Sequence, residues 1–469
     1  MKKTKIICSV GPISNTPDVM EQMVLAGMNV ARINFSHATI QERQKACDSV
    51  REVRKRTGEN VAILWDTKGP EFRCGVMEND GIELIDDHFI DIVKDEVIGT
   101  SERFSVNHPQ AIDSLSEGSI ILLENAKMKL EVIKKYTDKV TCKIINGGHL
   151  GSKKSLSVPG VDLDIPFISK EDEEDLIYAC EHGGEFIALS FVSTKEDVLE
   201  VKELLKKHNR EDFRIICKIE SALGIENLEE ILTVSDGIMV ARGDLGTEVK
   251  SEMVPIYQKQ MIKTCRMMGK IAIVATEMLE TMMENMRPKR AETSDIANAV
   301  LDGVDAVMLS GETTVGQHPV ETVKAMASIC ETTEEYAKFN YAFDIASLDS
   351  ITKAIASDVV LSTDALKAKL ICAATITGRT ARVISNLHPS APILALTPDD
   401  KTSRYLALNW GVYTKKLPIL ETTDMVLTES VKNAKEFMPL NKGDYIILTG
   451  GFPNTTTKQI TNLMKIEQI

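Results

Sequence analysis

The sequence predicts an α/β fold centred on a closed barrel of parallel strands. Eight short apolar runs recur along the chain, and the segments between them place apolar residues three and four positions apart. Strands that are apolar throughout and alternate with helices are typical of a parallel sheet covered on both faces. The 469-residue length also exceeds what one ordinary core accommodates, so we expect more than one domain.

The predicted strands come in two groups separated by a long interruption. They lie at residues 5–10, 29–34, 62–67, 186–191, 214–220, 237–242, 271–277 and 305–310. Residues 16–26 and 254–268 have the clearest helical periodicity. We therefore expect a (β/α)8 TIM barrel made of residues 1–70 and 168–345, with its active site at the carboxyl ends of the strands.

The interruption, residues 71–167, has a different pattern. Residues 128–135 and 138–145 alternate apolar and polar side chains, as half-exposed antiparallel strands do. This pattern predicts a small β-barrel domain inserted in a loop of the main barrel, where it would act as a lid.

The last part of the chain, residues 346–469, predicts a third unit. Residues 369–389 show the pattern strand, loop, helix, and residues 391–398 and 444–451 are further buried strands. We expect a C-terminal α/β domain.

Composition excludes several classes of protein. Lys and Arg number 55 against 69 Asp and Glu, and a net charge of −14 argues against nucleic acid or an anionic membrane as partner. Nine cysteines without a C-x-x-C pair are typical of reduced thiols. No segment resembles a signal peptide or a membrane span, so we expect a cytoplasmic protein.

Polar residues gather where the predicted barrel strands end. These residues are Ser9, Arg32, Asn34, Asp66, Thr67, Ser190, Lys218, Glu220, Arg242, Asp244, Thr276, Ser310 and Glu312. Lys218 and Glu220 are two apart on one strand and leave the same face. Glu220 and Asp244 end neighbouring strands, and two carboxylates with room for water and substrate oxygens suit Mg²⁺.

Arg32 and Lys218 beside such a metal would suit a phosphate-bearing substrate, because phosphoryl transfer requires neutralisation of oxygen charge. A single charged pair would be interpreted as a structural ion pair, and Thr276 alone as a hydroxyl bonded to its own backbone. The number of polar groups at one barrel mouth favours a catalytic site.

Several longer motifs resemble the pyruvate kinase family. They are "MNVARINFSH" (28–37), "WDTKGPEFR" (65–73), "KIE" (218–220), "MVARGDLG" (239–246), "VATEML" (274–279) and "RPKRAETSDIANAVLDGVDAVMLSGET" (287–313). The resemblance covers the whole chain. It implies transfer of a phosphoryl group from phosphoenolpyruvate to ADP, giving pyruvate and ATP in glycolysis, by a Mg²⁺- and K⁺-dependent enzyme that assembles as a homotetramer.

The resemblance also implies roles for individual residues. Glu220 and Asp244 would hold Mg²⁺ or Mn²⁺, and Lys218 would stabilise charge on the phosphoryl group and enolate. Thr276 would position the proton delivered to the enolate and contact the substrate carboxylate with Gly243, and Arg32 would bind the phosphate. The implied K⁺ site is Asn34, Ser36, Asp66 and Thr67, and the implied nucleotide contacts are Asn34, Phe35, Ser36, His37, Arg73 and Lys154.

Some positions depart from the family pattern. Glu124, Asn125 and Ala126 stand where Asp-Asp-Gly is usual, and Glu277 stands where Gln is usual. Met286, Lys289, Ser221, Ala222 and Cys74 are further departures. None removes a proposed metal ligand, the lysine or the threonine. Family members that dispense with K⁺ resemble this chain but carry a lysine where it has Glu71, so Glu71 predicts K⁺ dependence.

In the C-terminal part, "TITGRTA" (375–381) joins a predicted strand to a predicted helix. Such a loop is either an anion site at a helix N-terminus or an ordinary N-cap turn. The resemblance implies a site for a phosphorylated allosteric effector at Thr375, Thr377, Gly378, Arg379 and Thr380, facing a second loop at residues 450–462.

Two other functions are compatible with the strand-end residues. A Mg²⁺-dependent lyase acting through pyruvate enolate would use Glu220 and Asp244 but would need neither a lid nor Lys154. A degenerate regulatory paralogue would tolerate the departures in the lid but would have no need for intact Lys218 and Thr276.

Overall fold

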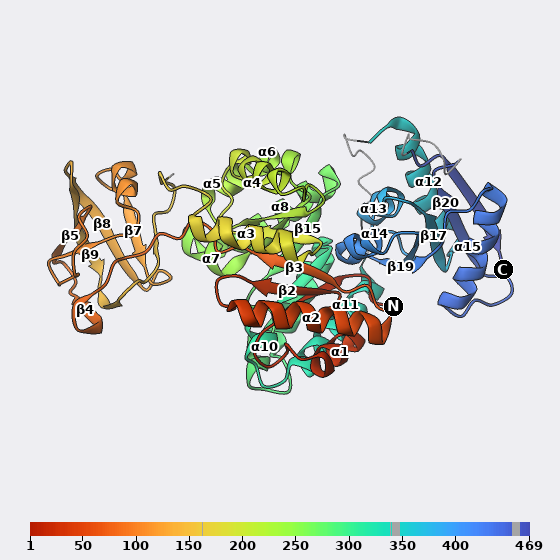
Figure 1. The fold of residues 1–469 in the computed structure, drawn as a ribbon, viewed down its shortest axis with the longest axis horizontal. Coiled ribbons are helices and arrows are strands. Elements are labelled where there is room, and N and C mark those ends of the chain that lie inside the picture. Colours follow the sequence, from red (N-terminus) through yellow and green to blue (C-terminus); the bar gives the residue numbers. More distant parts are fainter. Residues whose placement is uncertain (162, 338, 340–347, 453–459) are drawn as a thin grey trace.

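The computed structural model describes residues 1–469 except 162, 338, 340–347 and 453–459. It consists of a central barrel with an inserted β unit at one end and an α/β unit at the other (Figure 1). This arrangement confirms the predicted fold class.

Eight parallel strands form the closed barrel, in the order β1-β16-β15-β14-β13-β12-β3-β2. Their bounds are β1 (Lys5–Ser9), β2 (Val30–Asn34), β3 (Ala62–Asp66), β12 (Phe186–Leu189), β13 (Arg214–Ile219), β14 (Gly237–Ala241), β15 (Ile271–Ala275) and β16 (Ala306–Leu309). Each strand lies within one of the predicted apolar runs. The register pairs Asn34 with Asp66 and Lys218 with Met239, so the predicted polar strand ends meet at one mouth.

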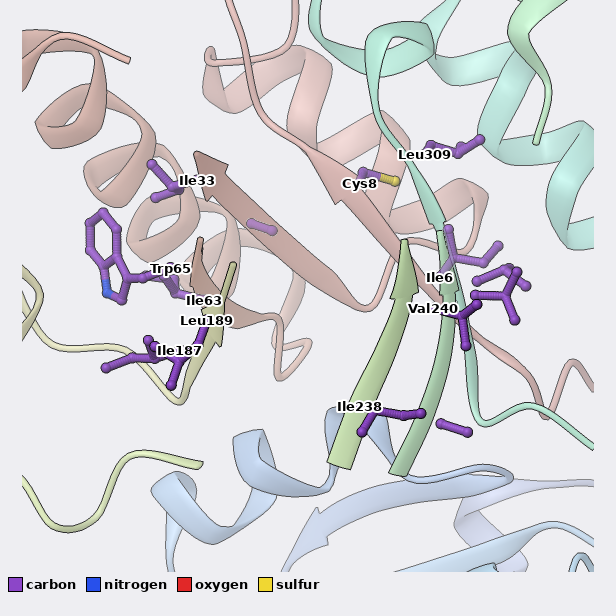
Figure 2. Close-up of a cluster of buried hydrophobic side chains, with 14 of the residues drawn as sticks. Ile6, Cys8, Ile33, Ile63, Trp65, Ile187, Leu189, Ile238, Val240 and Leu309 are labelled. Carbon is purple, nitrogen blue, oxygen red and sulfur yellow. The ribbon is translucent and has the colours of Figure 1, made fainter. Parts of the chain in front are cut away.

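Helices cover the outside of the barrel and bury one face of every strand. They are α1 (Pro17–Ala26), α2 (Ile40–Thr57), α3 (Lys170–His182), α4 (Lys195–Lys207), α5 (Ala222–Glu226), α6 (Leu228–Val234), α7 (Arg242–Glu248), α8 (Val254–Met268), α9 (Arg290–Asp302), α10 (Gly311–Thr314) and α11 (Pro319–Tyr336). Ile238 and Val240 of β14 pack outward with this helical layer (Figure 2), whereas Met239 packs inside the barrel. Because neither face of the strand is solvated, the sequence is apolar at every position.

The inserted unit contains two sheets. A six-stranded sheet has the order β11-β7-β8-β9-β5-β6, and β10 pairs with β4. The bounds are β4 (Gly81–Leu84), β5 (Phe89–Val93), β6 (Arg103–Ser105), β7 (Ile120–Leu123), β8 (Met128–Lys135), β9 (Lys139–Asn146), β10 (Gly148–Gly151) and β11 (Leu156–Ser157). Strands β8 and β9 are antiparallel, as their alternating pattern predicts. The unit has its own hydrophobic core, so it folds around buried residues separate from those of the barrel.

The C-terminal unit is a five-stranded sheet of order β19-β18-β17-β20-β21 with helices packed against it. Its elements are α12 (Ser350–Leu366), β17 (Leu370–Ala374), α13 (Arg379–Asn386), β18 (Ile393–Thr397), α14 (Asp400–Tyr405), β19 (Val412–Lys416), α15 (Thr423–Phe437), β20 (Tyr445–Gly450) and β21 (Leu463–Gln468). Helices α13 and α14 lie toward the barrel (Figure 1).

Buried polar contacts join the C-terminal unit to the amino-terminal end of the barrel. Arg404 of α14 pairs with Glu185, just before β12, over 2.5 Å. The Tyr405 hydroxyl donates to Asp212, just before β13, over 3.0 Å. The C-terminal unit therefore sits at the end of the barrel opposite the mouth. Among the described residues, no helix has both the length and the apolar composition needed to cross a bilayer.

Candidate active site

A buried chain of alternating charges crosses the carboxyl ends of β2, β3 and β13. Arg32 donates to Asp66 over 2.5 Å and to the Ser9 hydroxyl over 2.7 Å. Lys218 lies 3.4 Å from Asp66 and 3.0 Å from Glu220. The neighbouring Arg32 and Lys218 lower the pKa of Asp66 despite its burial. The two cations are thus held in place by carboxylates at the base of the mouth.

Ser190 is a further member of this network. It follows β12, accepts a hydrogen bond from Lys218 over 2.7 Å, and donates to the Thr67 carbonyl over 2.6 Å. The sequence places Ser190 among the strand ends, but no pattern assigned it a role. Its contact with Thr67 joins positions 123 apart in the sequence, so only the fold shows it.

The two carboxylate oxygens of Glu220 have different partners. Oε2 accepts a hydrogen bond from the Phe191 N–H over 2.7 Å, whereas Oε1 is buried and meets the Lys218 ammonium at 3.0 Å. Burial raises the pKa of Glu220 to about 7, and the charge of Asp244 adds to this effect. A buried carboxylate beside a second carboxylate fits a divalent cation.

Glu220 and Asp244 also line one cavity of about 500 Å³ between the barrel and the inserted unit. Within the described residues, no group of three or more His, Cys, Asp or Glu side chains is arranged to hold a metal. A cation bound by this pair would therefore need oxygens from substrate and water, which is how Mg²⁺ binds beside phosphates.

Thr276 lies on a strained turn after β15. Its φ is 70° and that of Glu277 is 54°, both in the left-handed region that non-glycine residues rarely occupy. The Thr276 hydroxyl accepts a hydrogen bond from the Gly243 N–H over 3.0 Å and donates to the Ala275 carbonyl over 2.6 Å. The hydroxyl therefore bonds to the adjacent backbone carbonyl, as a purely structural threonine would, and it also lies beside Gly243, as the catalytic interpretation requires.

Arg242 holds this turn in place. Its guanidinium donates to the Thr276 carbonyl over 2.6 Å and to the Glu277 carbonyl over 3.1 Å, and it pairs with Asp295 of α9 over 2.6 Å. Arg242 was predicted only as a strand-end residue. Its position directly before Gly243 was the available signal, but its bracing of Thr276 depends on packing between three barrel elements.

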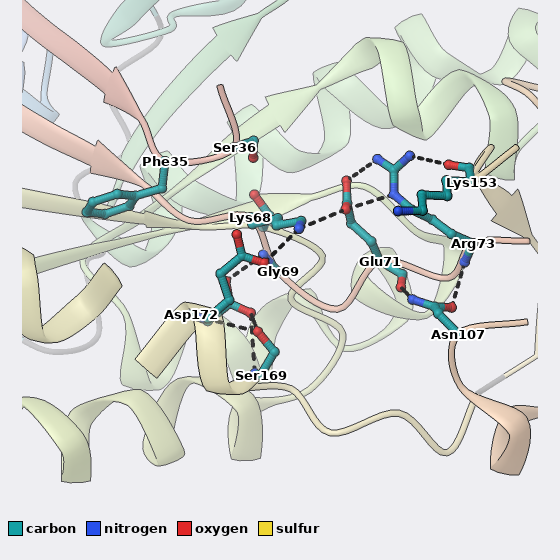
Figure 3. A network of polar contacts seen from close by, with 12 residues as sticks. Phe35, Ser36, Lys68, Gly69, Glu71, Arg73, Asn107, Lys153, Ser169 and Asp172 are labelled. Atoms are coloured by element: carbon teal, nitrogen blue, oxygen red, sulfur yellow. Dashed lines mark hydrogen bonds and ion pairs between the residues drawn. The ribbon is translucent and has the colours of Figure 1, made fainter. Parts of the chain in front are cut away.

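Three basic residues of the inserted unit, Arg73, Lys127 and Lys154, line the same cavity as Glu220 and Asp244. Lys154 lies 3.5 Å from Glu124. Arg73 forms two hydrogen bonds with Glu71, of 2.6 and 2.9 Å, and donates to the Lys153 carbonyl (Figure 3). The inserted unit therefore presents cations toward the barrel mouth.

The residues of the proposed K⁺ site lie at the ends of β2 and β3. Asn34 and Asp66 are register partners, and the Asn34 amide oxygen accepts from the Ser36 N–H over 3.0 Å. The Thr67 hydroxyl accepts from the Ser190 N–H over 3.1 Å. Their oxygens are therefore grouped at one edge, although those of Asn34, Asp66 and Thr67 already take part in protein contacts.

The segment after Asn34 divides between core and surface. Ser36 and His37 are exposed, whereas the Phe35 side chain is buried and stacks on Trp65 at 5.0 Å between ring centroids. Phe35 thus anchors the segment, and its exposed neighbours are the ones with side chains free to meet a ligand.

Sequence profiles for the pyruvate kinase barrel domain and alpha/beta domain match residues 1–323 and 353–467. Pyruvate kinase from Geobacillus stearothermophilus is 45% identical over 473 residues, covering 100% of this chain and 80% of that protein. Pyruvate kinase from Clostridium perfringens is 39% identical, with 100% of both chains covered. The crystal structure of a Cryptosporidium parvum pyruvate kinase superposes with a TM-score of 0.93 at 36% identity, covering 100% of this chain and 96% of that one. The chain belongs to the pyruvate kinase family. It is accordingly a phosphotransferase.

Four departures from the pyruvate kinase pattern fall in the inserted unit, at Cys74, Glu124, Asn125 and Ala126. Glu124, Asn125 and Ala126 all have left-handed backbones, with φ of 47°, 55° and 63°. Glu124 pairs with Lys127 over 3.2 Å as well as approaching Lys154. Alanine in a left-handed conformation is strained, so Ala126 has a cost that glycine would not have.

Two further departures have ordinary structural roles. Ser221 caps α5 by accepting a hydrogen bond from the Gly224 N–H over 3.1 Å. The Lys289 N–H, at the start of α9, donates to Glu292 over 2.8 Å. Neither contact touches the charge network of Lys218.

Some polar groups of the predicted effector loop have protein partners among the described residues and others do not. Gly378 is left-handed, with φ of 78°, and caps α13 without a side-chain hydrogen bond. Arg379 pairs with Asp349 over 3.1 Å, and the hydroxyls of Thr380 and Thr461 are 2.9 Å apart. Residues 453–459 of the facing loop lie outside the described residues.

Proposed function

We propose that the protein transfers the phosphoryl group of phosphoenolpyruvate to ADP. The products are pyruvate and ATP, and one proton is consumed when the enolate becomes pyruvate. The observation that carries this proposal is the continuous network Arg32–Asp66–Lys218–Glu220 at the mouth of a barrel whose family is that of the pyruvate kinases. Such a network supplies fixed positive charge where a phosphoryl group would lie.

Glu220 and Asp244 would hold Mg²⁺ or Mn²⁺, which when bound would neutralise oxygen charge on the substrates. Lys218 would stabilise the charge that develops on the phosphoryl group and on the enolate. Arg32 would bind the substrate phosphate through its guanidinium. Because Asp66 and Ser190 hold Lys218, its position requires no rearrangement during the reaction.

Thr276 and Gly243 would act on the other side of the substrate. We assign them contact with the substrate carboxylate, and Thr276 also the positioning of the proton delivered to the enolate carbon. The hydrogen bond between them supports this assignment, because it fixes the hydroxyl beside the first turn of α7.

Asn34, Ser36, His37, Arg73 and Lys154 would contact the nucleotide, with Phe35 supporting the segment from the core. Arg73 and Lys154 belong to the inserted unit, so closure of that unit over the mouth would bring them to the ADP phosphates. Asn34, Ser36, Asp66 and Thr67 would hold K⁺ close to the substrate phosphate.

The C-terminal unit would bind a phosphorylated effector at Thr375, Thr377, Gly378, Arg379 and Thr380. The uncapped first turn of α13 supports this proposal, because its N–H groups can donate to an anion. We also propose a homotetramer and a cytoplasmic location. The nine buried free cysteines are compatible with a reducing compartment.

One experiment tests the proposed reaction. Pyruvate formation from phosphoenolpyruvate is measured with and without ADP, Mg²⁺ and K⁺. A pyruvate kinase requires ADP and forms ATP in equal amount. A lyase acting through pyruvate enolate would not need ADP, and a degenerate paralogue would form no pyruvate under any condition.

A further inference from the structure

A second cavity lies far from the barrel mouth, between the amino-terminal end of the barrel and helix α13. Its volume is about 330 Å³. Arg214 and Lys270 line it from the barrel, and Arg379 and Arg382 line it from the C-terminal unit. The cavity thus lies at the junction that Tyr405 and Asp212 also bridge.

The charge of this cavity is opposite to that of the whole chain. Four of the described lining residues are cationic and one, Asp236, is anionic, although the chain carries a net charge of −14. Both oxygens of Asp236 are already engaged: one pairs with Arg214 over 3.0 Å, and the other accepts the Ile215 N–H over 3.0 Å. Arg379 pairs with Asp349 over 3.1 Å and Lys270 donates to the Ser235 carbonyl over 2.6 Å, which leaves Arg382 as the remaining cation of the lining.

Arg382 is the clearest sign of a missing partner. Its guanidinium forms no hydrogen bond or ion pair with any residue that the structure describes, although it is half-buried. Burial, and next the charge of Arg214, lower the pKa of Arg382. The Arg214 Nε is also buried without a hydrogen-bond partner. Like charges enclosed in this way are unfavourable unless an anion binds between them.

We propose that this cavity binds the phosphate group of a small phosphate monoester. A guanidinium is the side chain best suited to phosphate oxygens, since its donors form a planar fork. A dianion offsets several enclosed cations better than a monoanionic carboxylate does. Met268, Ile271 and Leu406 supply apolar walls beside the cations, which leaves room for an uncharged part of the ligand.

This site differs from the effector loop proposed above. Thr377 and Arg379 border both sites, but the loop offers the first turn of α13, whereas the cavity uses the side of α13 that faces the barrel, at Arg382 and Asn386. Arg214 and Lys270 belong to the cavity alone. The proposal also stands apart from the catalytic assignment, because the cavity lies at the other end of the barrel.

The test measures the apparent Tm of the full chain in inorganic phosphate at pH 8, against acetate at equal ionic strength. We expect phosphate to raise Tm by on the order of 2 °C or more, because a ligand of the native state stabilises it, and acetate to have a smaller effect. Arg382→Gln should lose at least half of the phosphate-specific rise. Lys442→Gln, at an exposed position of the same unit, should retain it.

A second measurement locates the anion without a substitution. Crystals of the wild-type chain soaked in tungstate should show an anomalous peak within hydrogen-bond distance of the Arg382 guanidinium. A Thr380→Val variant, altered at the effector loop, should keep that peak. A full phosphate response in Arg382→Gln, or tungstate peaks only at the effector loop or the barrel mouth, would overturn the proposal.

Discussion

Lys218 Nζ lies 3.0 Å from Glu220 Oε1 at the end of β13, where Glu220 is buried and Lys218 is largely shielded from solvent. The two residues are two positions apart, so they leave the same face of the strand. The ammonium also lies 3.4 Å from Asp66. One cation therefore stands between two buried carboxylates, which fixes its position and prevents either carboxylate from being left without compensation.

The first prediction concerns this lysine. Lys218→Met should lower turnover by several powers of ten, because preorganised electrostatic groups of this kind contribute roughly 3 kcal/mol or more. Binding of phosphoenolpyruvate should weaken much less, which steady-state kinetics and equilibrium titration would separate. Lys250→Met, at an exposed lysine after α7, is the control and should leave turnover unchanged. A Lys218→Met variant retaining a tenth of wild-type turnover would remove this residue from the mechanism.

A second prediction concerns Lys5, whose buried ammonium contacts the Val412 carbonyl and the Tyr413 ring. Burial, with the charge of Lys2, lowers the pKa of Lys5 to about 7. Between about pH 7 and 10 the unfolded chain therefore binds more protons here than the folded one, so stability contributed at this site rises with pH. The slope is about 1.4 kcal/mol per pH unit.

Urea unfolding of the wild type and of Lys5→Met at several pH values tests whether the stability contributed by Lys5 rises with pH. The difference between the two free energies of unfolding should shift in favour of the wild type as pH rises from 7.5 to 9.5. A difference that stays constant over this range would show that Lys5 keeps an ordinary pKa in the folded state.

The barrel was predictable because its strands are buried on both faces and therefore apolar throughout. The spacing of Lys218 and Glu220 on one strand predicted that they share a face, and the meeting of neighbouring strand ends placed Glu220 near Asp244. The bracing of Thr276 by Arg242 could not be predicted, because it joins positions 34 apart through a left-handed turn that no local pattern encodes. The docking of Arg404 on Glu185 could not be predicted either, since the two residues are 219 positions apart.

A third prediction concerns the lid. Replacing Glu124, Asn125 and Ala126 by Asp-Asp-Gly should change nucleotide KM or turnover modestly and leave metal dependence intact. Ala126→Gly alone should stabilise the inserted unit by about 1 kcal/mol, because it relieves a left-handed alanine. Kinetics and thermal unfolding measure the two effects. If the triple replacement created activity in a chain otherwise inactive, the degenerate-paralogue interpretation would be correct.

The fourth prediction concerns the effector loop. A sugar phosphate or nucleoside monophosphate should lower the half-saturating concentration of phosphoenolpyruvate, with a coupling of roughly 1–3 kcal/mol. Arg379→Ala combined with Thr380→Ala should abolish that shift and leave the maximal rate unchanged. Arg382→Gln alone is the comparison that separates this loop from the neighbouring cavity. Hyperbolic kinetics insensitive to every such compound would leave the loop as an ordinary helix cap.

The last prediction concerns K⁺ and rests on Glu71. Asn34, Ser36, Asp66 and Thr67 offer oxygens at one edge of the barrel, which suits a hard monovalent cation. The structure adds that Glu71 pairs with Arg73 and lies 3.8 Å from Lys68, so its own charge is largely offset (Figure 3). Residue 71 is therefore a carboxylate, and no lysine ammonium at this position takes the place of a bound K⁺.

We therefore expect strong activation by K⁺ and little by Na⁺. Glu71→Lys should give lower activity that is largely independent of K⁺, because an internal ammonium would take the place of the ion. Loss of the Glu71–Arg73 pair would by itself lower activity, so Glu71→Gln is the matched control and should remain K⁺-dependent. The measurement is turnover with saturating Mg²⁺ and substrates, with a bulky ammonium as the only other monovalent cation. Full wild-type turnover without K⁺ would refute the assignment of Asn34, Ser36, Asp66 and Thr67 to a K⁺ site.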